Sequence, residues 1–495
     1  MDNLYSELKK YNNCDIYPYH MPGHKRNMNT MPMAEAYAID LTEVEGSDNL
    51  YHAEGILKDA MQRAANLYHA EETHFLVNGS TGGILSAISA CVKQGGHILM
   101  ARNCHRSAYN AVMLKNLRST YLYPEYIKDW QVMGGITPEA VRIALEANPE
   151  IEAVFITSPT YEGLVSDIKQ LAEEVHKYDI PLIVDEAHGA HFGLNEVLPD
   201  SAVTEGADLV IQSLHKTLPA FTQTALLHVN GNRVDREKIR MYLSLYQTSS
   251  PSYVLMAGID QCIALLEEKR TTLFAQFYQN RQQFFDKIKE LKHIRILDKS
   301  ILQDIGGHAS FHAKNPYGTI AMDDCKLVIS AQGTNYNGQK LYEILLHQYG
   351  LQMEMAASTY VLAILTVMDT REGFDRLAKA LLAIDKEVHA MTEDNHQSTL
   401  EKEKIQIDTN ILYSCGKPFF TIGEAVEKDW ENCRLMMCEN RVAADYICLY
   451  PPGIPLIVPG EQFTACLIRQ IEAYQKEGLC LLGVEKNQNT VKVVK

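Results

Sequence analysis

Short apolar runs alternate with helical patterns through the first 290 residues, and this alternation constrains the fold more than any other feature of the chain. We expect buried strands at 75–77, 97–100, 153–156, 181–184 and 209–211. Apolar residues at helical spacing over 168–175 predict an amphipathic helix that Ser166 opens. Strand–helix alternation predicts an α/β fold with a mostly parallel sheet covered on both faces. Ligands of such sheets sit at the carboxyl ends of the strands.

Composition divides the chain into predicted segments. Residues 392–404 (TEDNHQSTLEKEK) contain a single apolar residue, which is typical of a linker. Strands at 326–329 and 361–367 predict a smaller α/β unit before it. The predicted organisation is an N-terminal arm at 1–60, a large domain at 61–290, a small α/β domain at 291–391, the linker at 392–404, and a C-terminal α+β domain at 405–495.

Charge and cysteine content exclude several classes of protein. With 46 Lys and Arg against 62 Asp and Glu, the net charge is −16, which argues against nucleic acid and anionic membranes as main partners. No uncharged apolar run approaches the roughly 18 residues needed to span a bilayer, and the N-terminus (MDNLYSELKK) has no apolar signal core. Eleven scattered cysteines without a CxxC pair favour free thiols in a reducing cytoplasm.

A glycine-rich turn follows the first predicted strand. Its sequence, NGSTGG at 78–83, lies between that strand and a helix. Glycines let the backbone approach an anion, and the free N–H groups at a helix start attract phosphate. The hydroxyls of Ser80 and Thr81 add donors. The turn is neither a Walker loop nor a GxGxxG fingerprint, and a simple helix-capping turn is the alternative.

A carboxylate ends the predicted strand PLIVD. Asp185 is followed by EAHGAH, and a buried carboxylate needs a partner. A protonated ring nitrogen of a cofactor is one candidate. A metal site with His188 and His191, or a turn capped by Asp185, are alternatives. Because the sequence shows no further clustered ligands, we predict no metal.

Two more polar groups follow strands. Lys216 lies in SLHKT after the strand DLVIQ, where burial lowers a lysine pKa and suits Schiff-base chemistry; an exposed loop lysine is the alternative. His105, in NCHRS after HILM, could stack on a planar ring or be a structural histidine. Together the four groups supply a phosphate site, a ring stacker, a carboxylate and an imine-forming lysine, which is what pyridoxal 5'-phosphate (PLP) requires.

These motifs resemble those of the PLP-dependent Orn/Lys/Arg decarboxylases of aminotransferase fold type I, in the short bacterial form typified by arginine decarboxylase. Besides the four groups, the resemblance rests on HMPGHK at 20–25, TSPTY at 157–161, SSPSY at 249–253 and YPPGIPLIVPGE at 450–461. The chain departs from the family pattern at 51–55, which reads YHAEG where HxPxG is frequent, and at Asn27, where glycine is usual. Both departures lie in the arm that shapes the substrate pocket.

The resemblance implies a role for each motif residue. Lys216, His105, Asp185 and His215 would be catalytic, with Lys216 bound covalently to the coenzyme and Asp185 paired with its ring nitrogen. The cofactor-binding set would be Ser80, Thr81, His105, Asp185, Ala187, His188, Ser213, His215 and Lys216. Within it, the phosphate would contact Ser80, Thr81, Ser213 and His215. The resemblance also implies a homodimer or higher homo-oligomer with active sites at the interface, near Ser249 and Ser250.

The implied reaction is decarboxylation of a small basic amino acid that feeds polyamine synthesis. Arginine, giving agmatine, is the favoured substrate, followed by lysine, giving cadaverine, and ornithine, giving putrescine. A basic substrate needs an acidic pocket, for which Glu43, Asp48, Glu354 and Glu461 are candidates, although each could be a solvated surface carboxylate. A PLP aminotransferase that uses Arg371 for a substrate carboxylate stays open, but Arg371 more simply starts an exposed helix. A non-catalytic protein that kept the fold is the other alternative.

Overall fold

The computed structural model describes residues 15–19, 48–299, 318–394, 416, 418–450, 453–485 and 488–495. The candidate Glu43, the motif at 20–25 and Asn27 lie outside the described residues.

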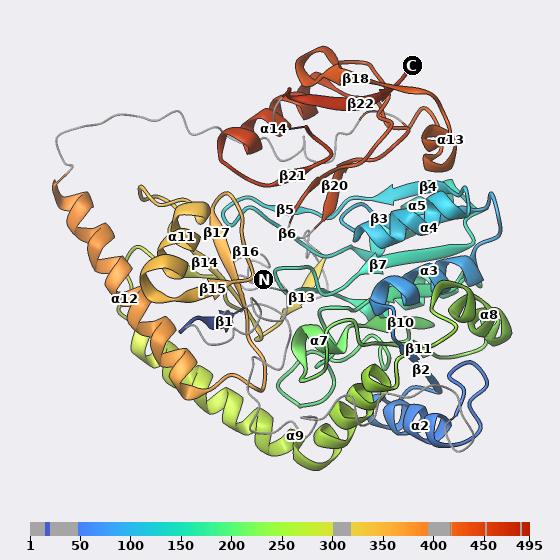
Figure 1. Cartoon of the computed structure of the whole chain (residues 1–495), viewed down its shortest axis with the longest axis horizontal. Coiled ribbons are helices and arrows are strands. Elements are labelled where there is room, and N and C mark those ends of the chain that lie inside the picture. Colours follow the sequence, from blue (N-terminus) through green and yellow to red (C-terminus); the bar gives the residue numbers. More distant parts are fainter. Residues whose placement is uncertain are drawn as a thin grey trace, which may run out of the picture.

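A seven-stranded sheet forms the centre of the large domain (Figure 1), in the order β2-β11-β10-β9-β7-β3-β4. The strands are β2 (Glu72–Leu76), β3 (His97–Ala101), β4 (Arg118–Leu122), β7 (Ala153–Thr157), β9 (Leu182–Asp185), β10 (Leu209–Gln212) and β11 (Ala225–Val229). The five strands from β10 to β4 pair in parallel, and β11 is antiparallel to both its neighbours. Their Val, Ile and Leu side chains are buried on both faces, as in covered parallel sheets. The predicted α/β fold is confirmed.

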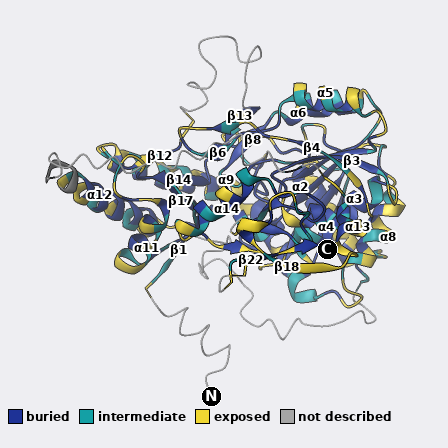
Figure 2. Ribbon diagram, turned by 90° about the horizontal axis from the view of Figure 1, so that it is seen from above, coloured by how far each residue is buried: buried dark blue, intermediate teal, exposed yellow. Residues whose placement is uncertain are grey.

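Helices cover the two faces of this sheet. Figure 2 shows α5 (Pro138–Ala147) and α6 (Ile168–His176) on one side, and α3 (Gly79–Cys91), α4 (Arg106–Leu114) and α8 (Arg236–Tyr246) on the other. One helix start differs from expectation. The N-cap of α6 is Asp167, which accepts from the N–H of Gln170, so the prediction that Ser166 opens it is wrong. Ser166 instead ends β8 (Leu164–Ser166), which pairs with β13 (Thr319–Met322).

The small domain packs beside the large one. Its antiparallel sheet has the order β12-β14-β17-β16, from β12 (Arg295–Ile296), β14 (Lys326–Ser330), β16 (Met355–Ala356) and β17 (Tyr360–Ile364). It is covered by α11 (Gly338–Tyr349), and the long α9 (Tyr253–Ile288) and α12 (Arg371–Asp394) run along its outer side in Figure 1. From the N-terminal arm, β1 (Tyr17–Tyr19) pairs in parallel with β15 (Leu351–Met353). Because α12 continues through Asp394, the start of the predicted linker at 392 is wrong; residues 395–404 lie outside the described part.

The C-terminal domain is a separate α+β unit with its own core. It contains β18 (Trp430–Arg434), β19 (Ile447–Leu449), β20 (Ile454–Ile457), β21 (Leu481–Leu482) and β22 (Thr490–Val494), with α13 (Ile422–Val426) and α14 (Ala465–Lys476). Figure 1 shows it lying across the end of the large domain where β3, β4 and α4 are found. The remaining described elements include the β5–β6 hairpin (Tyr126–Ile127 and Val132–Met133), α2 (Ile56–Tyr68) and the short α7 (Leu214–Thr217).

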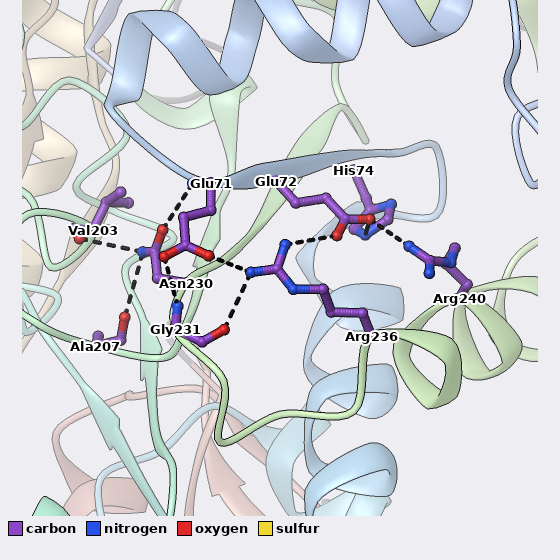
Figure 3. A network of polar contacts seen from close by, with 9 residues as sticks. All are labelled: Glu71, Glu72, His74, Val203, Ala207, Asn230, Gly231, Arg236 and Arg240. Atoms are coloured by element: carbon purple, nitrogen blue, oxygen red, sulfur yellow. Dashed lines mark hydrogen bonds and ion pairs between the residues drawn. The ribbon is translucent and has the colours of Figure 1, made fainter.

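A surface ion-pair network fixes α8 to the edge of the central sheet (Figure 3). Arg236 contacts Glu71 and donates to Glu72 at 3.0 Å, while Arg240 donates to the other oxygen of Glu72 at 2.8 Å. Such networks stabilise more than isolated exposed pairs do.

Within the described residues, every cysteine is a free thiol. A search of the same residues finds no helix with the length and apolar character of a membrane span.

Candidate active site

The predicted strand-end groups meet at one edge of the central sheet. Asp185 is the last residue of β9, and it stands opposite Ile211 on the neighbouring parallel β10. The chain then passes through Ser213 into α7, which holds His215 and Lys216. Because parallel neighbours end at the same edge, the sequence places the carboxylate and the amine on one side of the molecule.

Lys216 lies in a protein environment rather than in bulk solvent. Its Nζ is 3.0 Å from Nε2 of His188. Burial lowers the pKa of Lys216 to about 8, although the negative charge of Asp185 acts to raise it. A lysine with such a pKa has an appreciable fraction of neutral, nucleophilic amine near neutral pH.

Asp185 is a buried carboxylate with 3% of its surface exposed. One oxygen accepts from the backbone N–H of Ala187 at 3.1 Å. Burial raises the pKa of Asp185, while the Lys216 charge and this hydrogen bond oppose the rise. A cationic partner on the carboxylate would favour its ionised form.

The serine hydroxyls of the predicted phosphate site are in contact. Ser213 Oγ donates to Ser80 Oγ at 2.9 Å, at the first turn of α3. The turn into this helix requires Gly79, whose φ is +65° and whose N–H donates to the Gln223 carbonyl. Thr81 lies in the same helical turn and is partly exposed. Free N–H groups and two hydroxyls at a helix start suit a phosphate.

His215 precedes Lys216 in α7, and its ring is partly exposed. Its Nδ1 is 3.0 Å from the carbonyl oxygen of Thr224, so Nδ1 carries the proton of the neutral ring and Nε2 carries the lone pair. Burial lowers the pKa of His215 to about 4.

His105 is the N-cap of α4, and its Nδ1 accepts from the N–H of Ser107 at 3.2 Å. The side chain is accessible to solvent. The surrounding protein still desolvates it enough that burial, followed by the charge of Lys216, lowers the pKa of His105 to about 4. The ring is therefore neutral and beside Lys216.

These residues fit PLP by the chemistry of the donor set. A half-buried amine, a buried carboxylate, paired hydroxyls at a helix start and an accessible imidazole are the groups that such a coenzyme needs. The alternative metal site is less well matched, because both ring nitrogens of His188 face lysine amines. His191 is turned to the small domain, where its Nε2 lies 2.8 Å from Asp323.

The three candidate substrate carboxylates that the structure describes lie in different surroundings. Glu354 accepts from the hydroxyl of Tyr161 at 2.5 Å, and its charge acts on Lys216. The Tyr161 ring packs edge-on against His188, 4.6 Å between centroids. Asp48 instead accepts backbone N–H groups at the start of α2, including that of Gly55 at 2.8 Å. Among the described candidates, only Glu354 lies with Lys216, His188 and Tyr161, a group that we call the Lys216 cluster.

Glu461 forms a buried ion pair that joins the C-terminal domain to the large one. Its Oε2 is 3.1 Å from Arg102 Nη2, and both side chains are almost fully buried. Arg102 also donates to the carbonyl of Pro455 at 2.8 Å. Burial raises the pKa of Glu461, and the Arg102 charge opposes this.

Changing Glu461→Gln should destabilise the protein strongly. Removing one partner of a buried pair leaves the other charge uncompensated, at a cost of about 3–5 kcal/mol. We expect the urea midpoint of the variant to fall accordingly. The exposed pair Arg441–Glu431 offers the control, since Glu431→Gln should cost about 1 kcal/mol or less. Equal midpoints for the two variants would contradict the structural role of Glu461.

Sequence reasoning missed three residues of this region. Lys326 reaches His188 from the small domain, Tyr161 positions Glu354, and Arg102 holds the C-terminal domain. Each lies in or beside a recognised segment, but nothing local distinguishes it. The one available signal is a charged residue at the end of a buried strand, which requires a partner.

The sequence matches a known protein family. The family model "Orn/Lys/Arg decarboxylase, major domain" matches residues 2–372, and the C-terminal domain of the same family matches 411–490. Arginine decarboxylase of Bacillus subtilis is 29% identical over 99% of this chain and 97% of its own. Lysine decarboxylase LdcA of Pseudomonas aeruginosa is 21% identical, covering 90% of this chain and 72% of its own.

The fold has solved counterparts as well. Lysine decarboxylase LdcF of Francisella novicida superposes with a TM-score of 0.75 at 18% identity, covering 99% of this chain and 80% of its own. At this identity the likeness concerns the fold alone, which is PLP fold type I as expected. With the family models matching most of its length, the chain belongs to the Orn/Lys/Arg decarboxylase family of PLP-dependent amino acid decarboxylases.

Proposed function

We propose that this protein decarboxylates arginine to agmatine, with PLP bound to Lys216; lysine, giving cadaverine, and ornithine, giving putrescine, are the next candidate substrates. The observation that carries the proposal is the Lys216 amine, held 3.0 Å from His188 beside the buried Asp185. Arginine is preferred because the arginine decarboxylase of Bacillus subtilis has the higher identity and nearly complete coverage. The agmatine formed would feed polyamine synthesis.

The coenzyme, when bound, supplies a cationic ring that withdraws electrons from the substrate α-carbon. Asp185 would keep the ring nitrogen protonated by its charge. His105 and Ala187 would hold the ring, Ser80, Thr81, Ser213 and His215 would hold the phosphate, and His188 would contact the ring substituents. Each of these roles is a proposal from the family pattern and from the positions given above.

After CO2 leaves, the α-carbon must receive one proton. Lys216 and His215 are the two candidate donors. His215 has its Nδ1 proton committed to a carbonyl and its pKa lowered to about 4, so Nε2 is unprotonated near pH 7. Lys216 has a pKa of about 8, so its Nζ both takes up and gives up a proton near neutral pH. We therefore assign the proton transfer to Lys216 Nζ.

An amine-product screen tests the proposed function. Purified protein with added PLP is given arginine, lysine and ornithine in turn, and CO2 and amines are identified by mass. We expect agmatine as the fastest product. Release of a different amine would reassign the substrate, and amino transfer to an added keto acid without CO2 would refute decarboxylation. The position of Arg371, 69% exposed at the start of α12, does not favour an aminotransferase.

Glu354 is proposed to bind the distal cation of the substrate. A hydrogen bond to a charged group contributes about 1.5–3 kcal/mol, so Glu354→Gln should raise KM for arginine about 10- to 100-fold. The control is norleucine, which lacks the distal cation, and its slow turnover should change little. An equal loss with both substrates would show that Glu354 acts through the lysines instead.

We further propose a homodimer with active sites at the subunit interface. Ser249 and Ser250 are exposed, and the adjacent helix α8 exposes Met241 and Leu245, with 47% and 64% of their surfaces accessible. Apolar side chains gathered on one helix suit a subunit contact. Sedimentation should give a dimer mass or a multiple of it.

We also propose that the protein acts in the cytoplasm. We propose that its structural units are 1–60, 61–290, 291–391 and 405–495, with α12 extending past 391.

A further inference from the structure

A second buried lysine enters the Lys216 cluster from the small domain. Lys326 is the first residue of β14 and has 1% of its surface exposed. Its Nζ is 3.1 Å from Nδ1 of His188, and Nε2 of the same ring is 3.0 Å from Lys216. The imidazole therefore bridges two lysine amines from different domains.

The fold fits closely around Lys326. A Cβ added at Gly163 would lie 2.7 Å from Cγ of Lys326 and 3.1 Å from Cβ of Asp323. Gly163 also has φ of +98°, and its carbonyl accepts the N–H of Asp323. The turn after Tyr161 is thus shaped by glycine to let the lysine stem pass.

Hydrogen-bond counting restricts the charges in this bridge. A neutral imidazole has one N–H and one lone pair, so it donates to one lysine and accepts from the other. Two ammonium groups would require two accepting nitrogens, which a neutral ring lacks. Burial and the neighbouring cations hold the pKa of His188 well below its usual range, so the ring is neutral. One lysine of the bridge is then an ammonium and the other a neutral amine.

The surrounding carboxylates decide which lysine keeps the charge. Burial lowers the pKa of Lys326, while the charges of the fully buried Asp323, of Glu354 and of Glu162 oppose this. Burial disfavours the Asp323 carboxylate, but His191, Lys326 and its hydrogen bonds outweigh this and hold its pKa below the usual value. Burial lowers the pKa of Lys216 and the positive charge of Lys326 lowers it too, while the negative charges of Asp185 and Glu354 oppose this. Of the two lysines, Lys216 therefore loses its proton first, which leaves Lys326 as the ammonium and Lys216 as the amine of the bridge.

We propose that Lys326 is a positioning residue that sets the reactive state of Lys216. Its ammonium donates to Nδ1 of His188, which fixes the ring proton on Nε2. That proton points at Nζ of Lys216, so Lys216 is the member of the bridge that loses its proton. The proposal rests on the proposed function only in taking Lys216 as the coenzyme lysine.

The test measures the amine of Lys216 directly. Cofactor-free protein is treated with trace acetic anhydride over a range of pH, and acetylation of the peptide containing Lys216 is followed by mass spectrometry. In Lys326→Met the nearby positive charge is lost, so we expect the midpoint to rise by about one pH unit and labelling at pH 7 to slow about tenfold. Lys326→Arg keeps the charge and should stay close to the parent midpoint.

The matched control is Lys115→Met, since Lys115 is also buried but donates to Tyr242 and to the Ser89 carbonyl. It should leave the Lys216 midpoint unchanged. If Lys326→Met does not fold, histidine 15N spectra of the parent protein decide, with His188 assigned by its loss in His188→Gln. A neutral ring protonated at Nε2 is expected. Protonation at Nδ1, or an unchanged midpoint in folded Lys326→Met, would overturn the proposal.

This outcome is separable from the proposed function. Failure to form any amine from basic amino acids would refute decarboxylation while leaving the acetylation result intact. A normal product screen together with an unchanged midpoint would refute only the role of Lys326.

Discussion

Replacing Lys216 by alanine is expected to abolish turnover, with a loss of roughly 10³-fold or more, as when a nucleophile acting in a catalytic set is removed. The structure gives the reason, because Lys216 in α7 contacts His188, feels the charge of Asp185 and has a pKa lowered to about 8. The variant should also lose the covalent link to PLP, seen as loss of the imine absorbance band. Amine release from arginine under saturating PLP is the activity measurement.

Lys115→Met again supplies the control for loss of a buried lysine. Lys115 packs against Tyr242 in the large domain and takes no part in the Lys216 cluster. Its replacement should change stability but leave turnover of the folded protein near the parent value. Normal turnover by folded Lys216→Ala would show that the coenzyme lysine has been assigned to the wrong residue.

Asp185→Asn is the second variant with a large expected effect. Asparagine preserves the size of the side chain and an oxygen for the N–H of Ala187, but it removes the charge that would keep the coenzyme nitrogen protonated. Removing one preorganised electrostatic group from an active site costs about 10²–10³-fold in rate. We therefore expect kcat to fall by that factor while PLP remains bound to Lys216.

The neighbouring Glu186 offers a matched comparison. It is equally buried, but it accepts from Ser201 and Gln212 beneath the sheet edge, and burial raises its pKa to about 7. Glu186→Gln should lower stability with little effect on kcat. Similar losses of kcat in the two variants would mean that Asp185 matters only for local packing.

The central fold and the Lys216 cluster could be predicted because their signals are local. Each strand is a short apolar run, and each functional group is within a few residues of a strand end, so topology alone brings Asp185 and Lys216 together. The exact helix start could not be predicted, since Ser166 and Asp167 are adjacent and both can cap a helix. Likewise, a polar stretch at 392 does not break α12, because helix propensity continues through Asp394.

Contacts between domains could not be predicted in this way. Lys326 begins the strand KLVIS, whose pattern predicts the strand but not that its first side chain reaches His188. For the same reason the sequence did not distinguish Glu354, which meets Tyr161, from Glu461, which pairs with Arg102. The sequence shows where the carboxylates are, but the partner of each one depends on how the domains pack together.

Reduction of the coenzyme link with borohydride tests the central claim most directly. The resting protein, saturated with PLP, is treated with borohydride and digested, and the pyridoxyl-labelled peptide is identified by mass. The account predicts a stoichiometric label on Lys216 alone. A label on any other lysine, Lys326 included, or none despite full occupancy by PLP, would contradict it.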